Sequence, residues 1–138
     1  MSAKKDKNEI FKCYQCGLCK EMCPIFELSR KESKSPRGMM ALCQSVATGR
    51  IVPSKKFAEI FFDCTMCRGC TILCSMGLDI PNIIENMRSN LVETGVITRK
   101  VKQTLESLMK YHNPIGLHPT KRVEWTEKLN VKMFPSVK

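Results

Sequence analysis

Eight of the nine cysteines in this 138-residue sequence fall into two runs with identical spacing. Each run reads C-x-x-C-x-x-C-x-x-x-C, and the runs extend over residues 13–23 and 64–74. Thiolate sulfur is the ligand that iron–sulfur clusters require, and a cubane has four iron corners to fill. A C-x-x-C-x-x-C loop can wrap round one cubane and give a sulfur to three of these corners. The runs therefore predict two [4Fe–4S] clusters.

The fourth cysteine of each run lies beyond a three-residue gap, and in two-cluster proteins such a cysteine commonly binds the other cluster. We therefore expect crosswise ligation, with three ligands from one run and one from the other. The first cluster would be held by Cys13, Cys16, Cys19 and Cys74. The second cluster would be held by Cys64, Cys67, Cys70 and Cys23. All eight are predicted metal ligands, and no residue is assigned a catalytic role.

Two other interpretations of the cysteines remain open, namely two Cys₄ zinc sites or disulfides in an oxidised chain. Zinc modules usually carry paired C-x-x-C units that are well separated. The N-terminus is charged and lacks the apolar stretch of a signal peptide, so we expect a cytoplasmic protein, in which disulfides are rare. The ninth cysteine, Cys43, is predicted to be a buried small apolar residue, with a redox thiol as the alternative.

Helical patterns lie between and after the two runs, and these helices must position the cysteines. The first covers residues 35–49, with Ser35 as its cap, and three others are expected to begin at Ser54, Asp79 and Thr98. A last short helix is expected through Trp125 and Leu129. Apolar residues at helical spacing predict the inward faces Met39, Cys43, Val46, Ala47; Phe57, Ile60, Phe61; Ile84, Met87, Leu91; and Val101, Leu105, Leu108, Met109. No alternating pattern predicts a strand, so the fold class is all-α.

The pattern divides the chain into three parts. We expect a flexible N-terminal segment over residues 1–10, a dicluster helical domain over residues 11–95 and a helical C-terminal docking extension over residues 96–138. In the extension, Trp125 lies close in sequence to Lys121, Arg122 and Lys128, and tryptophan and arginine are enriched at interface hot spots. A tryptophan that covers the domain's own core is an equally consistent interpretation.

The formal charge of +10 is compatible with nucleic acid or with an acidic partner, and the chain stays basic after eight thiolates and two dicationic cores are counted. The lysines and arginines are spread along the chain, so we expect no nucleic-acid binding, and a zinc-stabilised nucleic-acid-binding module is a remote alternative. No stretch approaches the roughly 20 apolar residues of a membrane helix, so we expect no direct membrane insertion. Triads, phosphate-binding glycine loops and dinucleotide fingerprints are missing from the sequence, which favours a non-catalytic subunit.

Four short sequence segments resemble those of the α-helical ferredoxin family. They are Cys13-Tyr14-Gln15-Cys16-Gly17, Ser35-Pro36-Arg37-Gly38, Gly77-Leu78-Asp79-Ile80-Pro81 and Asn113-Pro114-Ile115-Gly116. Similar segments occur in the iron–sulfur subunits of succinate dehydrogenase, anaerobic glycerol-3-phosphate dehydrogenase, glycolate oxidase and heterodisulfide reductases. The likeness extends from Phe11 to about Leu129 and implies an α-helical ferredoxin fold with two [4Fe–4S] clusters.

The sequence ends at Lys138 and contains no Cys-Cys pair, so the resemblance implies a stand-alone subunit similar to the C component of heterodisulfide reductase. It implies an electron-transfer subunit of an oxidoreductase complex. This subunit would work between a flavin-containing donor and a separate Cys-Cys-Gly-domain protein that resembles the B component of heterodisulfide reductase. The alternative is the iron–sulfur subunit of a lactate, glycolate or glycerol-3-phosphate dehydrogenase.

Overall fold

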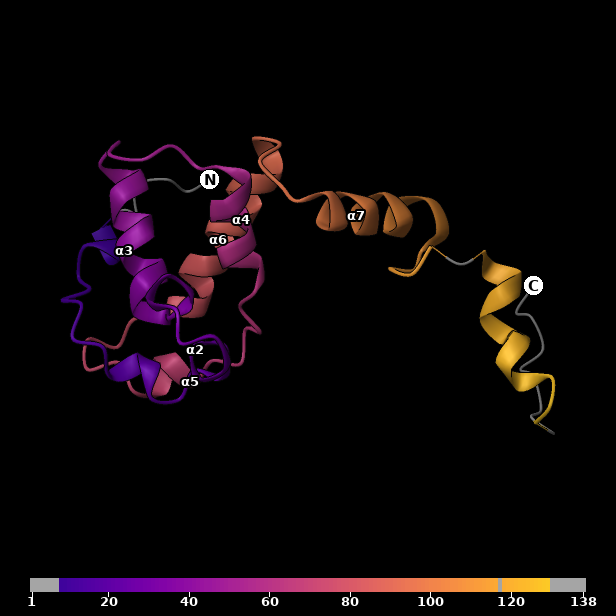
Figure 1. The fold of residues 1–138 in the computed structure, drawn as a ribbon, viewed down its shortest axis with the longest axis horizontal. Coiled ribbons are helices and arrows are strands. Elements are labelled where there is room, and N and C mark those ends of the chain that lie inside the picture. The colour runs from indigo at the N-terminus through magenta and orange to yellow at the C-terminus, as the bar shows by residue number, and fades with distance from the viewer. Residues whose placement is uncertain (1–7, 117, 130–138) are drawn as a thin grey trace. The chain divides into compact units, whose positions relative to one another are not determined.

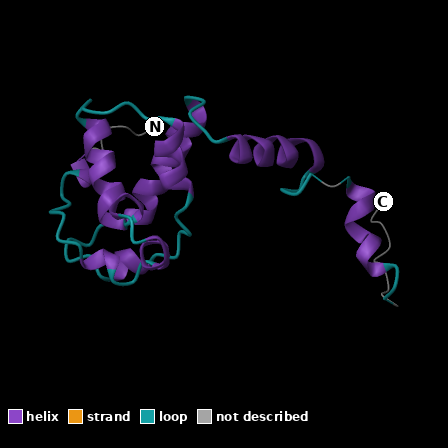
Figure 2. Ribbon diagram, in the orientation of Figure 1, coloured by secondary structure: helices purple, strands orange, loops and turns teal. Residues whose placement is uncertain are grey.

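The computed structural model describes residues 8–116 and 118–129, and every regular element in these ranges is a helix (Figures 1 and 2). The all-α prediction is therefore confirmed. Labels η mark 3₁₀-helices. The elements are η1 (Leu18–Lys20), α2 (Pro24–Ser29), η2 (Glu32–Lys34), α3 (Pro36–Ala47), α4 (Lys55–Phe62), α5 (Gly69–Ile72), α6 (Ile80–Glu93), α7 (Arg99–Tyr111) and η3 (Pro119–Thr126).

The chain forms two compact units, Met1–Thr98 and Arg99–Lys138. Most of the segment expected to be flexible, residues 1–7, lies outside the described residues, while residues 8–10 are helical and Ile10 is buried. Among the described helices, none combines the length and the apolar character needed to cross a bilayer.

Three helices of the first unit begin at the capping residues predicted from the sequence. Ser35, Ser54 and Asp79 precede α3, α4 and α6, and each side chain accepts a hydrogen bond from the backbone N–H three residues later. The N···O distances are 2.9, 3.3 and 3.4 Å. Each bond satisfies a donor that the helix itself leaves unpaired. After α6, Gly95 adopts a φ of 72°, a left-handed conformation that suits glycine and ends the helix.

Helices α3, α4 and α6 enclose the core of the first unit, with α6 in contact with both α3 and α4 (Figure 1). Phe57 and Phe61 of α4 stack with ring centroids 4.6 Å apart. The inward positions predicted for these helices are confirmed as buried or half-buried, whereas the sequence pattern missed Met40, which is fully buried. The largest fully buried side chains are Phe61, Met39, Met40, Ile80, Ile84, Leu91, Pro81, Cys43 and Ser35.

The inward face predicted for α7 is wrong within the second unit at three of its four positions. Helix α7 begins after Thr98 as expected, and Val101 is half-buried, but Leu105, Leu108 and Met109 are exposed and no residue of the helix is fully buried. A unit whose described elements are one α-helix and one 3₁₀-helix has too little chain to build a core. The apolar pattern correctly gave the helix but not its burial.

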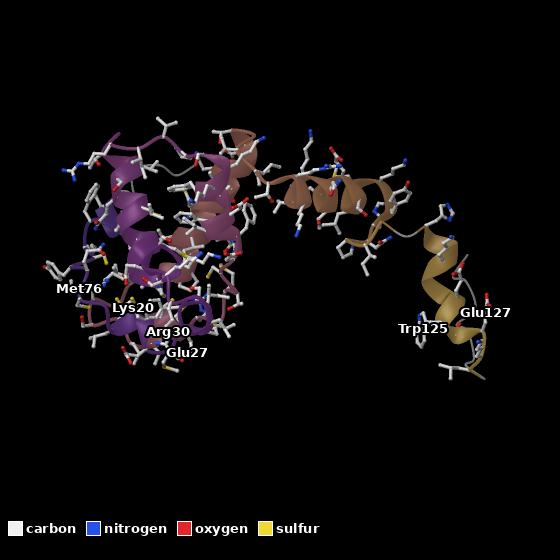
Figure 3. All side chains as sticks on the ribbon, viewed as in Figure 1. Lys20, Glu27, Arg30, Met76, Trp125 and Glu127 are labelled. Carbon is white, nitrogen blue, oxygen red and sulfur yellow. The ribbon has the colours of Figure 1, made fainter. Side chains whose placement is uncertain are left out.

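The predicted last helix is a 3₁₀-helix, η3, that ends at Thr126, before Leu129. Trp125 projects outward from η3 and is 70% exposed, so it covers no core of the second unit (Figure 3). Lys121 and Lys128 are also exposed, and the side chain of Arg122 lies outside the described residues.

A Ser35→Ala variant is expected to lower the free energy of unfolding by about 1–2 kcal/mol, because the capping bond to Gly38 is lost. Ser35 is also fully buried and donates to the Glu32 carboxylate at 3.0 Å, which adds to the cost. Ser33→Ala is the matched control, since Ser33 is exposed and should change stability by less than about 0.5 kcal/mol. Equal denaturation curves for the two variants would contradict this prediction.

Candidate metal centre

Two cavities in the first unit are each lined by four cysteines. The first cavity is lined by Cys13, Cys16, Cys19 and Cys74. The second is lined by Cys64, Cys67, Cys70 and Cys23. Each cavity thus brings together three cysteines of one run and the last cysteine of the other, which is the grouping that crosswise ligation requires.

The two cysteine loops share one backbone conformation. Gln15 and Met66, 51 residues apart, have φ values of 61° and 57°, and Gly17 and Arg68, with the same separation, have φ values of 90° and 65°. Left-handed residues on both sides of the second cysteine turn the chain sharply. The same turn is therefore made with glycine in the first loop and with arginine in the second.

Gln44 of α3 ties the first loop to the core. Its Nε2 donates to the backbone oxygens of Ile10 at 3.0 Å and Cys13 at 3.2 Å. Its Oε1 accepts a hydrogen bond from Nε2 of Gln15 at 3.2 Å. The amide therefore fixes the backbone at the first cysteine of the run.

Arg88 of α6 makes the equivalent connection to the second loop. Its Nε and Nη2 donate to the backbone oxygen of Phe61 at 2.9 and 2.7 Å, and its Nη2 donates to that of Cys64 at 2.5 Å. The guanidinium also lies over the ring of Phe62, 5.4 Å from the centroid. Neither Gln44 nor Arg88 was predicted from the sequence. Gln44 follows the capping residue Ser35 by nine positions, and Arg88 follows the capping residue Asp79 by nine. A comparison of the sequence around the first cysteine run with that around the second could have found this shared spacing.

The last cysteine of each run is held by a backbone N–H. The Sγ of Cys23 caps α2 and accepts from the N–H of Phe26 at 3.4 Å. The Sγ of Cys74 accepts from the N–H of Leu78 at the same distance. Such bonds stabilise thiolate sulfur and are among the factors that tune an iron–sulfur cluster. Helix α2 was not predicted, because its six residues are too few to give a periodic pattern.

The inner cysteines of the two cavities lie in an environment that disfavours bare thiolates. Burial, together with the nearby Cys13, Cys16 and Cys74, raises the pKa of the Cys19 thiol to about 11. Burial and the neighbouring cysteines likewise raise the pKa of the Cys70 thiol to about 12. Several thiolates around one cavity repel one another, and a cationic metal core relieves that repulsion.

The donor set fits a [4Fe–4S] cubane. Four soft sulfur ligands surround each cavity, and backbone donors reach the sulfurs of the two crosswise cysteines. In a zinc site, four ligands converge on one point at about 2.3 Å for sulfur. Within the described part of the chain, no group of three or more His, Cys, Asp or Glu side chains is arranged to hold a single metal ion.

Each cavity also has an exposed cysteine and charged neighbours. Cys16 and Cys67, the second cysteines of the runs, are exposed. Arg37 lines the first cavity, and Lys34 and Arg68 line the second. All three cations are paired with carboxylates: Arg37 with Glu32 at 2.7 Å, Lys34 with Asp63 at 2.5 Å and Arg68 with Asp79 at 2.8 Å. The hydrogen bond from Arg37, with help from Ser35 and Lys20, lowers the pKa of Glu32 to about 2.

Cys43 lies apart from the eight cysteines of the two runs, and it lines neither of the two cavities. It is fully buried in the core on α3, and burial raises its pKa to about 12. The prediction of a buried apolar residue at this position is confirmed.

Comparison with known proteins gives a family for this site. Residues 9–78 match the family model of the 4Fe–4S dicluster domain. A probable glycolate oxidase iron–sulfur subunit of Bacillus subtilis (strain 168) is 34% identical over 84 residues, which are 60% of this chain and 19% of the relative. An Hdr-like menaquinol oxidoreductase iron–sulfur subunit 2 of Archaeoglobus fulgidus is 26% identical over 137 residues, 83% of this chain and 25% of the relative.

The D component of a dihydromethanophenazine:CoB--CoM heterodisulfide reductase of Methanosarcina acetivorans is 26% identical over 149 residues, 91% of this chain and 36% of the relative. The chain thus spans between about a fifth and about a third of the length of these curated relatives. The matched family segment covers the whole first cysteine run and the whole second run. This chain therefore belongs to the 4Fe–4S dicluster domain family, and its cofactors are two [4Fe–4S] clusters that transfer electrons.

Proposed function

We propose that this chain is the electron-relay subunit of a heterodisulfide-reductase-type complex. It takes electrons from a flavin-containing partner and passes them to a Cys-Cys-Gly-domain subunit. The observation that carries this proposal is the pair of four-cysteine cavities within one helical unit. Each [4Fe–4S] cluster supplies one-electron redox chemistry, and two clusters in one unit can connect a two-electron donor to a two-electron acceptor site.

We assign the ligands crosswise. Cys13, Cys16, Cys19 and Cys74 hold the first cluster. Cys64, Cys67, Cys70 and Cys23 hold the second cluster. The assignment is supported by the two cavity linings and by the matching N–H bonds to the sulfurs of the two crosswise cysteines. The exposed Cys16 and Cys67 give each cluster an edge near the protein surface, where electrons can enter or leave.

We further propose that the segment after residue 95 docks on the Cys-Cys-Gly-domain partner. Leu105, Leu108 and Met109 of α7 are exposed, as is Trp125 of η3. Aromatic and methionine side chains are enriched at protein interfaces, so these residues are suited to contact a partner. The predicted boundary at residues 95–96 lies close to the division between the compact units at Thr98.

A second candidate is the iron–sulfur subunit of a glycolate, lactate or glycerol-3-phosphate dehydrogenase. The relative from Bacillus subtilis, at 34% identity, favours this candidate, although the match covers only 60% of the chain. The chain would transfer electrons in the same way in both complexes. The two candidates differ in the proteins that bind this chain.

Anaerobic purification of the native complex through a tag on this chain tests the proposal. We expect a Cys-Cys-Gly-domain protein and a flavoprotein to co-purify, with about eight iron and eight sulfide per copy of this chain. The natural electron donor should reduce both clusters. A co-purifying hydroxy-acid dehydrogenase would favour the second candidate, and one zinc per four cysteines without visible colour would contradict both.

A further inference from the structure

The two halves of the first unit are related by an internal repeat. Equivalent cysteines of the runs are 51 residues apart, and the capping residues Ser35 and Asp79 are 44 residues apart. The residues nine positions after these caps, Gln44 and Arg88, make the same kind of contact to the first cysteine of a run. At this equivalent position, one half carries a neutral amide and the other carries a cation.

Arg88 is not neutralised by a carboxylate in the part of the chain that the structure describes. Its hydrogen bonds go to the backbone oxygens of Phe61 and Cys64. Glu85 and Glu93 line the same surface groove, but neither forms an ion pair with it among the described residues. The half-buried guanidinium thus lies, without an ion pair among the described residues, beside the backbone of a predicted cluster ligand.

The other cations near the two cavities are paired with carboxylates. Lys34 and Arg68 at the second cavity each have a carboxylate of their own, whereas Arg37 at the first cavity shares Glu32 with Lys20. Arg50 lines the groove beside Gln44, but it is exposed, and water screens its charge. At the position equivalent to that of Gln44, Arg88 is thus a half-buried cation that forms no ion pair among the described residues.

We propose that Arg88 raises the reduction potential of the cluster held by Cys64, Cys67, Cys70 and Cys23. Both clusters have four cysteine ligands, so a difference in potential must come from their surroundings. Reduction adds one negative charge to a centre that is already negative with its four thiolates. A nearby, poorly screened cation stabilises the reduced form by Coulomb attraction. The inference rests on the ligand assignment under the proposed function.

Exchanging the side chains of Gln44 and Arg88 tests the inference. Glutamine at position 44 already shows that an amide can bind a cysteine loop. Redox titration of the purified protein, followed by EPR, measures both potentials, and iron analysis verifies cluster content. Arg88→Gln should lower the potential of the second cluster more than that of the first. Arg88→Lys, which keeps the charge, should largely preserve it. Gln44→Arg faces an open groove and should raise the potential of the first cluster.

The ligand variants Cys13→Ala and Cys64→Ala assign the two redox waves, since each should remove one of them. Equal shifts of the two cluster potentials in Arg88→Gln would overturn the role of Arg88. The same holds if the potential of the second cluster shifts equally in Arg88→Gln and Arg88→Lys. Either result would leave the two-cluster relay standing. Fewer than two waves in the unaltered protein would contradict the proposed function itself, and the inference with it. Should Arg88→Gln fail to fold, an unmoved first wave in Gln44→Arg would still overturn the inference.

Discussion

A Cys74→Ser variant is expected to lose the cluster bound by the first cysteine run and to keep the cluster bound by the run to which Cys74 belongs. Cys74 lines the same cavity as Cys13, Cys16 and Cys19. A serine oxygen is a harder and poorer ligand for the iron of a cluster than thiolate sulfur. The iron content should therefore fall from about eight to about four per chain, as measured by metal analysis and by EPR of the reduced protein.

Double variants distinguish crosswise ligation from ligation within each run. Adding Cys13→Ser to Cys74→Ser should remove no further iron, because both side chains line one cavity. Adding Cys67→Ser to Cys74→Ser should remove the second cluster as well, because Cys67 lines the other cavity. Cys43→Ala is the matched control and should keep both clusters. The opposite order of iron loss in the two double variants would show that ligation follows the runs instead.

A Gly38→Ala variant is expected to be severely destabilised, although alanine normally favours a helix by about 1 kcal/mol over glycine. A Cβ at Gly38 would lie 1.9 Å from the backbone oxygen of Glu32 and 3.0 Å from the Cα of Ser33. Backbone atoms cannot move aside as a flexible side chain can, so η2 would have to shift away from α3. We expect a loss of about 3 kcal/mol or more in the free energy of unfolding.

This clash also has a consequence for the clusters. Glu32 holds Arg37 at the first cavity, and Lys34, at the end of η2, lines the second. A displaced η2 should therefore speed the loss of both clusters to an iron chelator. Gly49→Ala is the control, because a Cβ there meets nothing within 4 Å and is strained only by a φ of 71°, worth about 1 kcal/mol. Similar melting temperatures for the two variants would refute the steric argument.

Much of the fold was predictable because it depends on short-range chemistry. Ser35, Ser54 and Asp79 mark the starts of α3, α4 and α6 since a capping side chain bonds to a backbone N–H only three residues away. Most of the inward positions of these helices followed from spacing, although Met40 did not. The same reasoning failed for α7, whose apolar pattern was expected to face inward, because periodicity gives a helix a face but does not provide a partner to cover it.

The residues that hold the cysteine loops could not be found from local patterns. Gln44 contacts Cys13 across 31 residues, and Arg88 contacts Cys64 across 24, and neither residue type is unusual on a half-exposed helix. Gly38 resembles an ordinary helical glycine in the sequence, and only the position of η2 against it reveals the close approach. The crosswise ligand sets stay a prediction, which the two cavity linings support.

The sequence by itself determined the chemistry of this protein: eight thiols in two runs specify two [4Fe–4S] clusters and an all-α frame, because ligand type and spacing are local properties of the chain. Only the tertiary structure decided what surrounds each loop, which includes a neutral amide beside one and a cation beside the other. Such differences arise from contacts between segments far apart in sequence. The long-range packing of α3 and α6 therefore makes two nearly identical motifs electrostatically unequal.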